Sequence, residues 1–140
     1  MSQRPDRELH TLVGLRARGF KLSIDDFGTG ESSLCRVDAI EFQEVKIDRS
    51  FVRPLGERGD PALVASISDL AHALGAKAVA EGVESDATAR HLTELGCDAI
   101  QGFHLARPLP PGKLAEWLRD LPSDTVGLKG HSRPADAVTV

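Results

Sequence analysis

The chain has 140 residues, of which 41% are apolar and 27% are charged, a composition typical of one globular domain. This length excludes a complete eight-stranded βα barrel, which takes about 250 residues. The 17 Lys and Arg residues are outnumbered by 21 Asp and Glu residues, and the net charge of -4 excludes a chain-wide basic field that would attract nucleic acid.

Two features of the sequence concern the cellular compartment. No apolar run approaches the roughly 18 residues needed to cross a bilayer, and the N-terminus lacks the apolar core of a signal peptide. We therefore expect a cytoplasmic protein. The only cysteines, Cys35 and Cys97, lie far apart without CxxC spacing, so we expect both to be reduced thiols in the core.

The first part of the chain predicts a helix followed by a strand. Apolar residues at helical spacing indicate a helix over 5–18, with Gly19 as its C-cap. Residues 20–24 alternate apolar and polar side chains and run into the segment DDFGTG at 25–30. This pattern indicates a strand that ends at two aspartates in a glycine-rich turn.

The rest of the chain predicts alternating helices and strands. The expected elements are a short helix over 32–40, a strand over 42–47, a helix over 61–74 capped by Asp60, a strand over 76–80, a helix over 85–95, a brief strand at 99–100 and one or two helical turns over 114–118. One helix followed by four β-α units predicts an α/β fold with parallel strands. Residues 121–140 show no periodicity, and we expect a flexible tail there.

Every predicted strand ends near an ionisable or amide side chain. These residues are Asp25 and Asp26, then Lys46 and Asp48, then Glu81 and Glu84, and finally Gln101. Ligands of parallel α/β folds bind at this carboxyl edge of the sheet. Because converging carboxylates repel one another unless cations neutralise them, the cluster predicts Mg²⁺ or Mn²⁺. The chemistry indicated is metal-assisted phosphoester hydrolysis, with Lys46 holding the nucleophile.

The same residues allow simpler interpretations, which the sequence leaves open. Paired aspartates before a glycine are typical of an ordinary hydrogen-bonded turn. Lys46 and Asp48 suit a surface ion pair, Glu84 suits the start of a helix, and Gln101 suits a loop cap. The five histidines lack metal-ligand spacing, and we expect structural or solvent-exposed roles for them.

Two other families with acidic pairs fit poorly. Phosphoacceptor receiver domains place their lysine several strands after the aspartates, whereas Lys46 lies on the very next predicted strand. Phosphatases of the haloacid dehalogenase type require Asp-x-Asp, whereas Asp25 and Asp26 are adjacent.

Six segments resemble the EAL-domain phosphodiesterases, which hydrolyse the bacterial second messenger cyclic di-GMP. The segments are IDDFGTGESSL, VKIDRSFV, ALVASISDLAHALG, AVAEGVES, LGCDAIQGF and ARPLPP, and they occur in family order. The resemblance covers about residues 9–118. It implies that residues 1–120 form a partial TIM-type (βα) barrel, an open half-barrel of about four parallel strands with flanking helices.

The resemblance also implies a role for individual residues. Asp25 resembles the aspartate that bridges two metal ions in the family, and Asp26 resembles its neighbour at the second metal. Lys46 resembles the lysine that contacts the hydrolytic water and the phosphate. Glu81 resembles the glutamate assigned as second-site ligand or general base, and Gln101 resembles the glutamine that completes the site.

A loop on the substrate side is implied as well. Its residues are Phe27, Gly28, Thr29 and Gly30, together with Glu84 of the EGVE motif. Glu31 departs from the family pattern, because an aromatic residue is usual at this position.

The larger departure is that the family's opening Glu-Ala-Leu strand, a metal-binding Asn and a further strand-end Glu have no counterpart in the chain. The two-metal site is then incomplete, so we expect the chain alone to be inactive in converting cyclic di-GMP to linear pGpG. The alternatives are a non-catalytic module that binds cyclic di-GMP or a protein, and a truncated reading frame without a role of its own. Other implied partners are a second copy in a homodimer and an upstream sensory or GGDEF-type domain.

Overall fold

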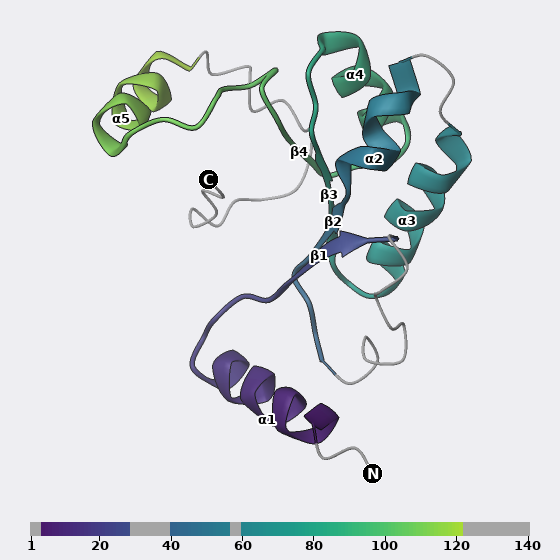
Figure 1. The fold of residues 1–140 in the computed structure, drawn as a ribbon, viewed down its shortest axis with the longest axis vertical. Helices are drawn as coiled ribbons and strands as arrows, with labels where there is room; N and C mark the ends of the chain where they lie inside the picture. The colour runs from purple at the N-terminus through teal and green to yellow at the C-terminus, as the bar shows by residue number, and fades with distance from the viewer. Residues whose placement is uncertain (1–3, 29–39, 57–59, 122–140) are drawn as a thin grey trace.

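A four-stranded parallel sheet forms the centre of the computed structural model, which describes residues 4–28, 40–56 and 60–121 (Figure 1). The strands are β1 (Ser23–Phe27), β2 (Glu44–Ile47), β3 (Lys77–Glu81) and β4 (Ala99–Gln101), and they are adjacent in chain order. The helices are α1 (Arg4–Ala17), α2 (Arg49–Val52), the 3-10 helix η2 (Arg53–Gly56), α3 (Pro61–Ala73), α4 (Asp86–Glu94) and α5 (Pro111–Asp120). Parallel strands with flanking helices confirm the predicted α/β half-barrel.

Several boundaries differ from those predicted. β1 covers Ser23–Phe27 instead of 20–24, so the paired aspartates lie inside the strand and not after it. α5 is a helix of 10 residues where one or two turns were expected, and α2 and η2 were not predicted. The helix expected over 32–40 and the tail expected over 121–140 lie, apart from Ile40 and Leu121, outside the described residues.

Side-chain caps determine where the long helices begin. The Ala62 N–H donates to the carboxylate of Asp60 at 2.9 Å, and Pro61 occupies the first turn of α3, where its missing N–H costs no hydrogen bond. The Thr88 N–H donates to the hydroxyl of Ser85 at 3.1 Å and starts α4. The Asp60 cap lies at the predicted position, whereas the cap at Ser85 was not predicted.

The apolar core lies between the sheet and the helices α2, α3 and α4 (Figure 1). Its fully buried members include Val45, Ile47, Val52, Val64, Ala71, Ala78, Ala80 and Leu92. Since side chains alternate along a strand, the residues between these core positions point to the opposite face. That face carries Lys46 and Glu81 together with the buried Val79, so the charged side chains of the two central strands lie on the side of the sheet away from the helices.

Helices α1 and α5 lie away from this core, at the lower and upper left of Figure 1. No described side chain of either helix is buried, and Val13 of α1 and Leu118 of α5 are 50% and 43% exposed. An ion pair of 2.7 Å between Arg16 and Glu41 links α1 to the chain that precedes β2. Within the described residues, no helix is both long enough and apolar enough to span a membrane.

Candidate metal centre

A bulge in β1 turns two adjacent aspartates toward the same region. Consecutive residues of a regular strand point to opposite faces. The pairing of β1 with β2 shifts between Ile24 and Phe27, where β1 carries one more residue than its partner strand. Asp26 adopts a φ of 51°, in the left-handed region that Asp tolerates better than most residues, and its N–H donates to Oδ1 of Asp25 at 3.0 Å.

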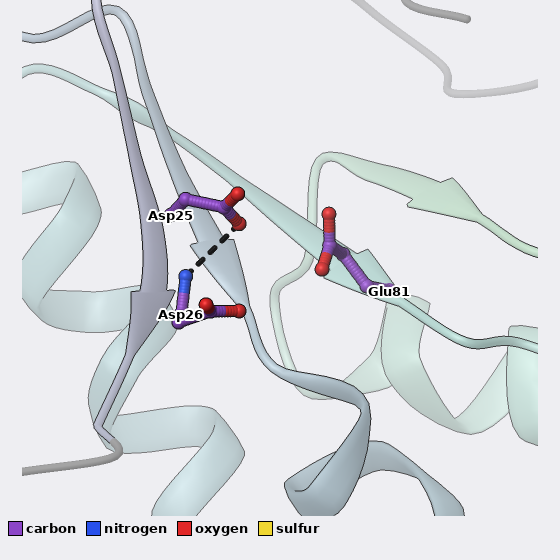
Figure 2. A group of neighbouring side chains, drawn as sticks. All are labelled: Asp25, Asp26 and Glu81. Atoms are coloured by element: carbon purple, nitrogen blue, oxygen red, sulfur yellow. Dashed lines mark hydrogen bonds between the residues drawn. The ribbon is translucent and has the colours of Figure 1, made fainter.

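Glu81 completes a group of three carboxylates with these aspartates. Figure 2 shows Asp25 and Asp26 on β1 and Glu81 on β3, with their side chains directed toward one another. Each residue offers one oxygen, and the three oxygens all lie within 4.8 Å of one another. Carboxylate oxygens are the ligands that Mg²⁺, Mn²⁺ and Ca²⁺ prefer, so the donor set fits a hard divalent cation.

Electrostatic repulsion is concentrated at Asp26. The negative charge of Asp25 raises the pKa of Asp26, and desolvation and the nearby Asp48 raise it further. A bound cation would relieve this repulsion, because it would be attracted to every carboxylate in the group.

Lys46 supplies a positive charge next to the cluster. Its Nζ lies 2.6 Å from Oε1 of Glu81, and this hydrogen bond is the largest cause of the raised pKa of Lys46. Lys46 pairs in register with Val79, two positions before Glu81, and therefore shares a sheet face with Glu81. The sequence left open a surface ion pair of Lys46 with Asp48, and the structure instead pairs Lys46 with Glu81.

Asp48 and Glu84 take part in other interactions near this edge. The Ser50 N–H donates to Asp48 at 2.9 Å and caps α2. Hydrogen bonding with the Ser50 side chain, followed by this backbone hydrogen bond, lowers the pKa of Asp48. Glu84 is exposed and lies 3.5 Å from Arg53 of η2. Both residues lie on the segments that follow β2 and β3.

Gln101 lies at the same level of the sheet as Glu81, because the two residues are register partners on β4 and β3. Gly102 lets the backbone after β4 pass very close to the backbone of the segment after β3. A Cβ at Gly102 would overlap backbone atoms of Val83, whose N–H donates to the carbonyl of Gln101 at 3.1 Å. Sequence reasoning missed this positioning role of Gly102, although a glycine directly after a strand is a signal for close backbone approach.

The glycine-rich segment after β1 is only partly described. Phe27 is 7% exposed and packs in the core, so the structure places it there and not in a substrate-facing loop. Gly28 has a φ of 99°, and a Cβ at this position would lie 2.9 Å from the ring of Phe51. Thr29 and Gly30 lie outside the described residues.

Comparison with known families places this site in context. The model of the EAL domain family matches residues 1–108. The chain belongs to the EAL domain family. The resemblance noted in the sequence is therefore confirmed, and the EAL motifs IDDF, VKID and AEGVE carry the residues that meet at the carboxyl edge of the sheet.

Several EAL proteins are similar to this chain. It is 46% identical over 110 residues to MucR of Pseudomonas aeruginosa, a "bifunctional diguanylate cyclase/cyclic di-GMP phosphodiesterase", which corresponds to 78% of this chain and 16% of MucR. A solved structure of the MucR phosphodiesterase in complex with c-di-GMP matches with a TM-score of 0.72 and 44% identity over 80% of this chain and 46% of that one.

Two further EAL structures match the same fold. The EAL domain of Mycobacterium smegmatis DcpA matches with a TM-score of 0.78 and 38% identity over 86% of this chain and 56% of that one. Klebsiella pneumoniae BlrP1, solved with manganese and cyclic di-GMP, matches with a TM-score of 0.65 and 36% identity over 76% of this chain and 27% of that one. The chain thus spans between about a quarter and just over half of these solved chains.

Proposed function

We propose that this EAL segment forms part of a metal-dependent phosphodiesterase that hydrolyses cyclic di-GMP to linear pGpG. The observation that carries the proposal is the convergence of Asp25, Asp26 and Glu81 at the carboxyl edge of the sheet, with oxygens within 4.8 Å of one another. The similarity to MucR, named as a cyclic di-GMP phosphodiesterase, supports this choice of substrate.

The three carboxylates would hold Mg²⁺ or Mn²⁺, and the manganese in the BlrP1 structure supports a divalent metal for this family. A bound divalent ion acts as a Lewis acid and lowers the pKa of bound water. The protein's part is to hold three carboxylates close together, which the bulge at Asp26 and the ion pair at Glu81 support.

Lys46 and Gln101 would hold the substrate. Glu81 accepts one hydrogen bond from the Lys46 ammonium, which has three N–H donors, so two donors are left for a phosphate oxygen or a water molecule. The Gln101 amide lies at the register position beside Glu81 and offers both donor and acceptor atoms to the same ligand.

On its own, the chain would bind metal weakly and be inactive toward cyclic di-GMP. Its described residues supply four strands, whereas a complete TIM-type barrel has eight, and a cation held from one side keeps fewer protein ligands. The second candidate function is therefore a non-catalytic module that binds cyclic di-GMP, which the exposed position of Asp25 and Asp26 on an open sheet favours.

The decisive experiment grafts this segment into an active relative. Residues 9–118 replace the matching part of the MucR phosphodiesterase domain, and linear pGpG is measured by chromatography with Mn²⁺ present. We expect hydrolysis, with a loss of at least 100-fold in Glu81→Gln and in Lys46→Met. Glu116→Gln, which changes an exposed carboxylate on α5, should leave the rate unchanged.

Two results would count against hydrolysis. A folded chimera that binds cyclic di-GMP without cleaving it would favour the non-catalytic module. A chimera that cleaves cyclic di-GMP equally well with Glu81→Gln would refute the assigned site.

A further inference from the structure

The short helix α2 contacts the chain directly after two strands, β1 and β3. A Cβ at Gly28, the residue after β1, would lie 2.9 Å from the ring of Phe51. A Cβ at Gly82, the residue after β3, would lie 2.5 Å from the Cβ of Arg49. Because β1 and β3 carry the three carboxylates, α2 touches the backbone on both sides of the candidate metal centre.

The carboxylates come from strands that are not neighbours, because β2 lies between β1 and β3. Asp25 and Asp26 therefore meet Glu81 across a whole strand, and no direct pairing of β1 with β3 sets the distance between them. Helix α2 continues β2, since only Asp48 separates the two elements. An element that continues the middle strand and contacts the ends of both outer strands can set this distance.

Helix α2 is itself anchored at both of its ends. Val52, its last residue, is fully buried in the apolar core. At its start the Ser50 N–H donates to the carboxylate of Asp48 at 2.9 Å. A force on Arg49 would therefore have to move a helix that is held by the core and by its cap.

The chain that follows Gly82 is anchored as well. Val83 is fully buried, and its N–H donates to the carbonyl of Gln101 at 3.1 Å. A methyl group at Gly82 would overlap the Cβ of Arg49, which is bonded to the backbone and cannot rotate away. The displacement would then fall on Glu81, the last residue of its strand.

We propose that α2 positions the Glu81 carboxylate, and that the close contact of Gly82 with the Cβ of Arg49 sets its distance from the aspartates of β1. Gly82 and Arg49 are positioning residues, since they act through Glu81. This inference rests on the proposed function only in taking Glu81 as a metal ligand. The hydrogen bond of 2.6 Å from Lys46 reports the position of Glu81 without any metal.

Paired substitutions test the contact. Gly82→Ala introduces the methyl group, and Arg49→Gly as a second substitution removes the Cβ that this group would overlap. Gly82→Ala with Arg49→Ala is the matched control, because it also removes the guanidinium but keeps the Cβ. Gly75→Ala separates backbone strain from displacement, since Gly75 has the same φ of 72° and no described atom lies within 4 Å of its Cβ position.

The first readout is the coupling energy between Lys46 and Glu81 in the presence of chelator. Urea denaturation of a double-mutant cycle with Lys46→Met and Glu81→Gln gives this energy in each background. We expect Gly82→Ala to lose more than about half of the coupling, Arg49→Gly to restore it, and Arg49→Ala to leave it lost. Gly75→Ala should lower the stability of the chain and keep the coupling.

The second readout is Mn²⁺ binding to the 140-residue chain, followed by the electron paramagnetic resonance signal of the free ion. The dissociation constant should rise about tenfold or more in Gly82→Ala and return to within about threefold of the unmodified value with Arg49→Gly. Gly75→Ala should bind Mn²⁺ as the unmodified chain does.

The proposal is overturned if the unmodified chain shows no coupling, if Gly82→Ala keeps it in full, or if Arg49→Gly and Arg49→Ala restore it equally. If Gly82→Ala alone does not fold, the double variants decide, because only Arg49→Gly should restore both folding and coupling. Rescue by both second substitutions, or by neither, overturns the proposal. The expected pattern of coupling in chains that bind no Mn²⁺ would refute the proposed function and leave this inference standing.

Discussion

The ammonium of Lys46 lies 2.6 Å from the carboxylate of Glu81 and joins the two central strands on the polar face of the sheet. The two side chains are 17% and 21% exposed, so the pair is partly shielded from water. The pair positions the Glu81 carboxylate beside the aspartates, and its loss should affect both stability and metal binding.

Lys46→Met should destabilise the protein by about 1–2 kcal/mol, between the values for exposed and buried ion pairs, because Glu81 loses its partner in a partly desolvated position. Urea denaturation measures this change. Lys113→Met is the matched control, since it removes an exposed 3.0 Å pair with Glu116 and should cost less than about 1 kcal/mol. Equal losses of stability in Lys46→Met and Lys113→Met would contradict the partly shielded environment of the Lys46–Glu81 pair.

The stabilisation that the ion pair of Lys46 and Glu81 contributes should be lost at high pH and kept at neutral pH. Folding raises the pKa of Lys46, so the stabilisation is fully present below the ordinary value of 10.5 and is lost as the pH rises through the folded-state value. A double-mutant cycle with Lys46→Met and Glu81→Gln, measured between pH 7 and 11, tests this. A coupling energy that is already absent at pH 8 would contradict the prediction.

Asp26→Asn should raise the melting temperature at pH 7 in the absence of metal. Folding raises the pKa of Asp26, so its ionised form costs stability above the folded-state pKa, and this cost disappears as the pH falls to the ordinary value of 3.8. Asn also tolerates the φ of 51°. Thermal unfolding in chelator at pH 7 and near pH 4 should show a gain only at pH 7.

Asp69→Asn, an exposed position on α3, serves as the control and should change the melting temperature little at either pH. Asp26→Asn should also weaken Mn²⁺ binding, measured by calorimetry. A variant that gains no stability at pH 7 would contradict the repulsion at Asp26. A variant that binds Mn²⁺ as tightly as the unmodified protein would contradict the role of Asp26 as a metal ligand.

Gly102→Ala should destabilise the protein by about 2–4 kcal/mol, because the new methyl group would overlap backbone atoms of Val83 and separate β4 from the turn after β3. Gly112→Ala is the matched control, since no atom of the described residues lies within 4 Å of the position that a Cβ would take there, and alanine favours the helix by about 0.5–1 kcal/mol. Chemical denaturation of both variants measures the change in the free energy of unfolding. A Gly102→Ala variant as stable as the unmodified protein would contradict the close approach of the Gly102 and Val83 backbones.

Cys97 should react slowly with thiol reagents in the native protein. Burial raises the pKa of its thiol, which lowers the fraction of reactive thiolate, and the Sγ lies 3.6 Å from the Ser68 hydroxyl. A Cys35→Ser variant isolates the signal. At pH 8 we expect reaction at least about 100-fold slower than in denaturant, and native reaction at the denatured rate would contradict the buried position.

The sequence predicted those features that depend on neighbouring residues. Asp60 lies where a helix cap was expected, because capping is decided within one turn. Lys46, Glu81 and Gln101 were expected at one edge, because the carboxyl ends of parallel strands coincide.

Features that depend on strand register could not be predicted. The bulge that aligns Asp25 with Asp26 exists only in the pairing of β1 with β2. The ion pair of Lys46 with Glu81 was not predicted, since it depends on how β2 aligns with β3. For the same reason Phe27 was expected in a loop, whereas its pairing with Ile47 places it in the core.

The residues that form the apolar core and the charged residues of the candidate site lie on opposite faces of the sheet, so mutations can change one set without changing the other. The positions of β2 and β3 that face the helices, such as Val45 and Ala80, hold the core together, whereas Lys46 and Glu81 lie on the opposite face. A descendant gene could therefore replace Lys46 and Glu81 with neutral residues and still encode a folded protein. Such a copy would keep the fold without the proposed metal site.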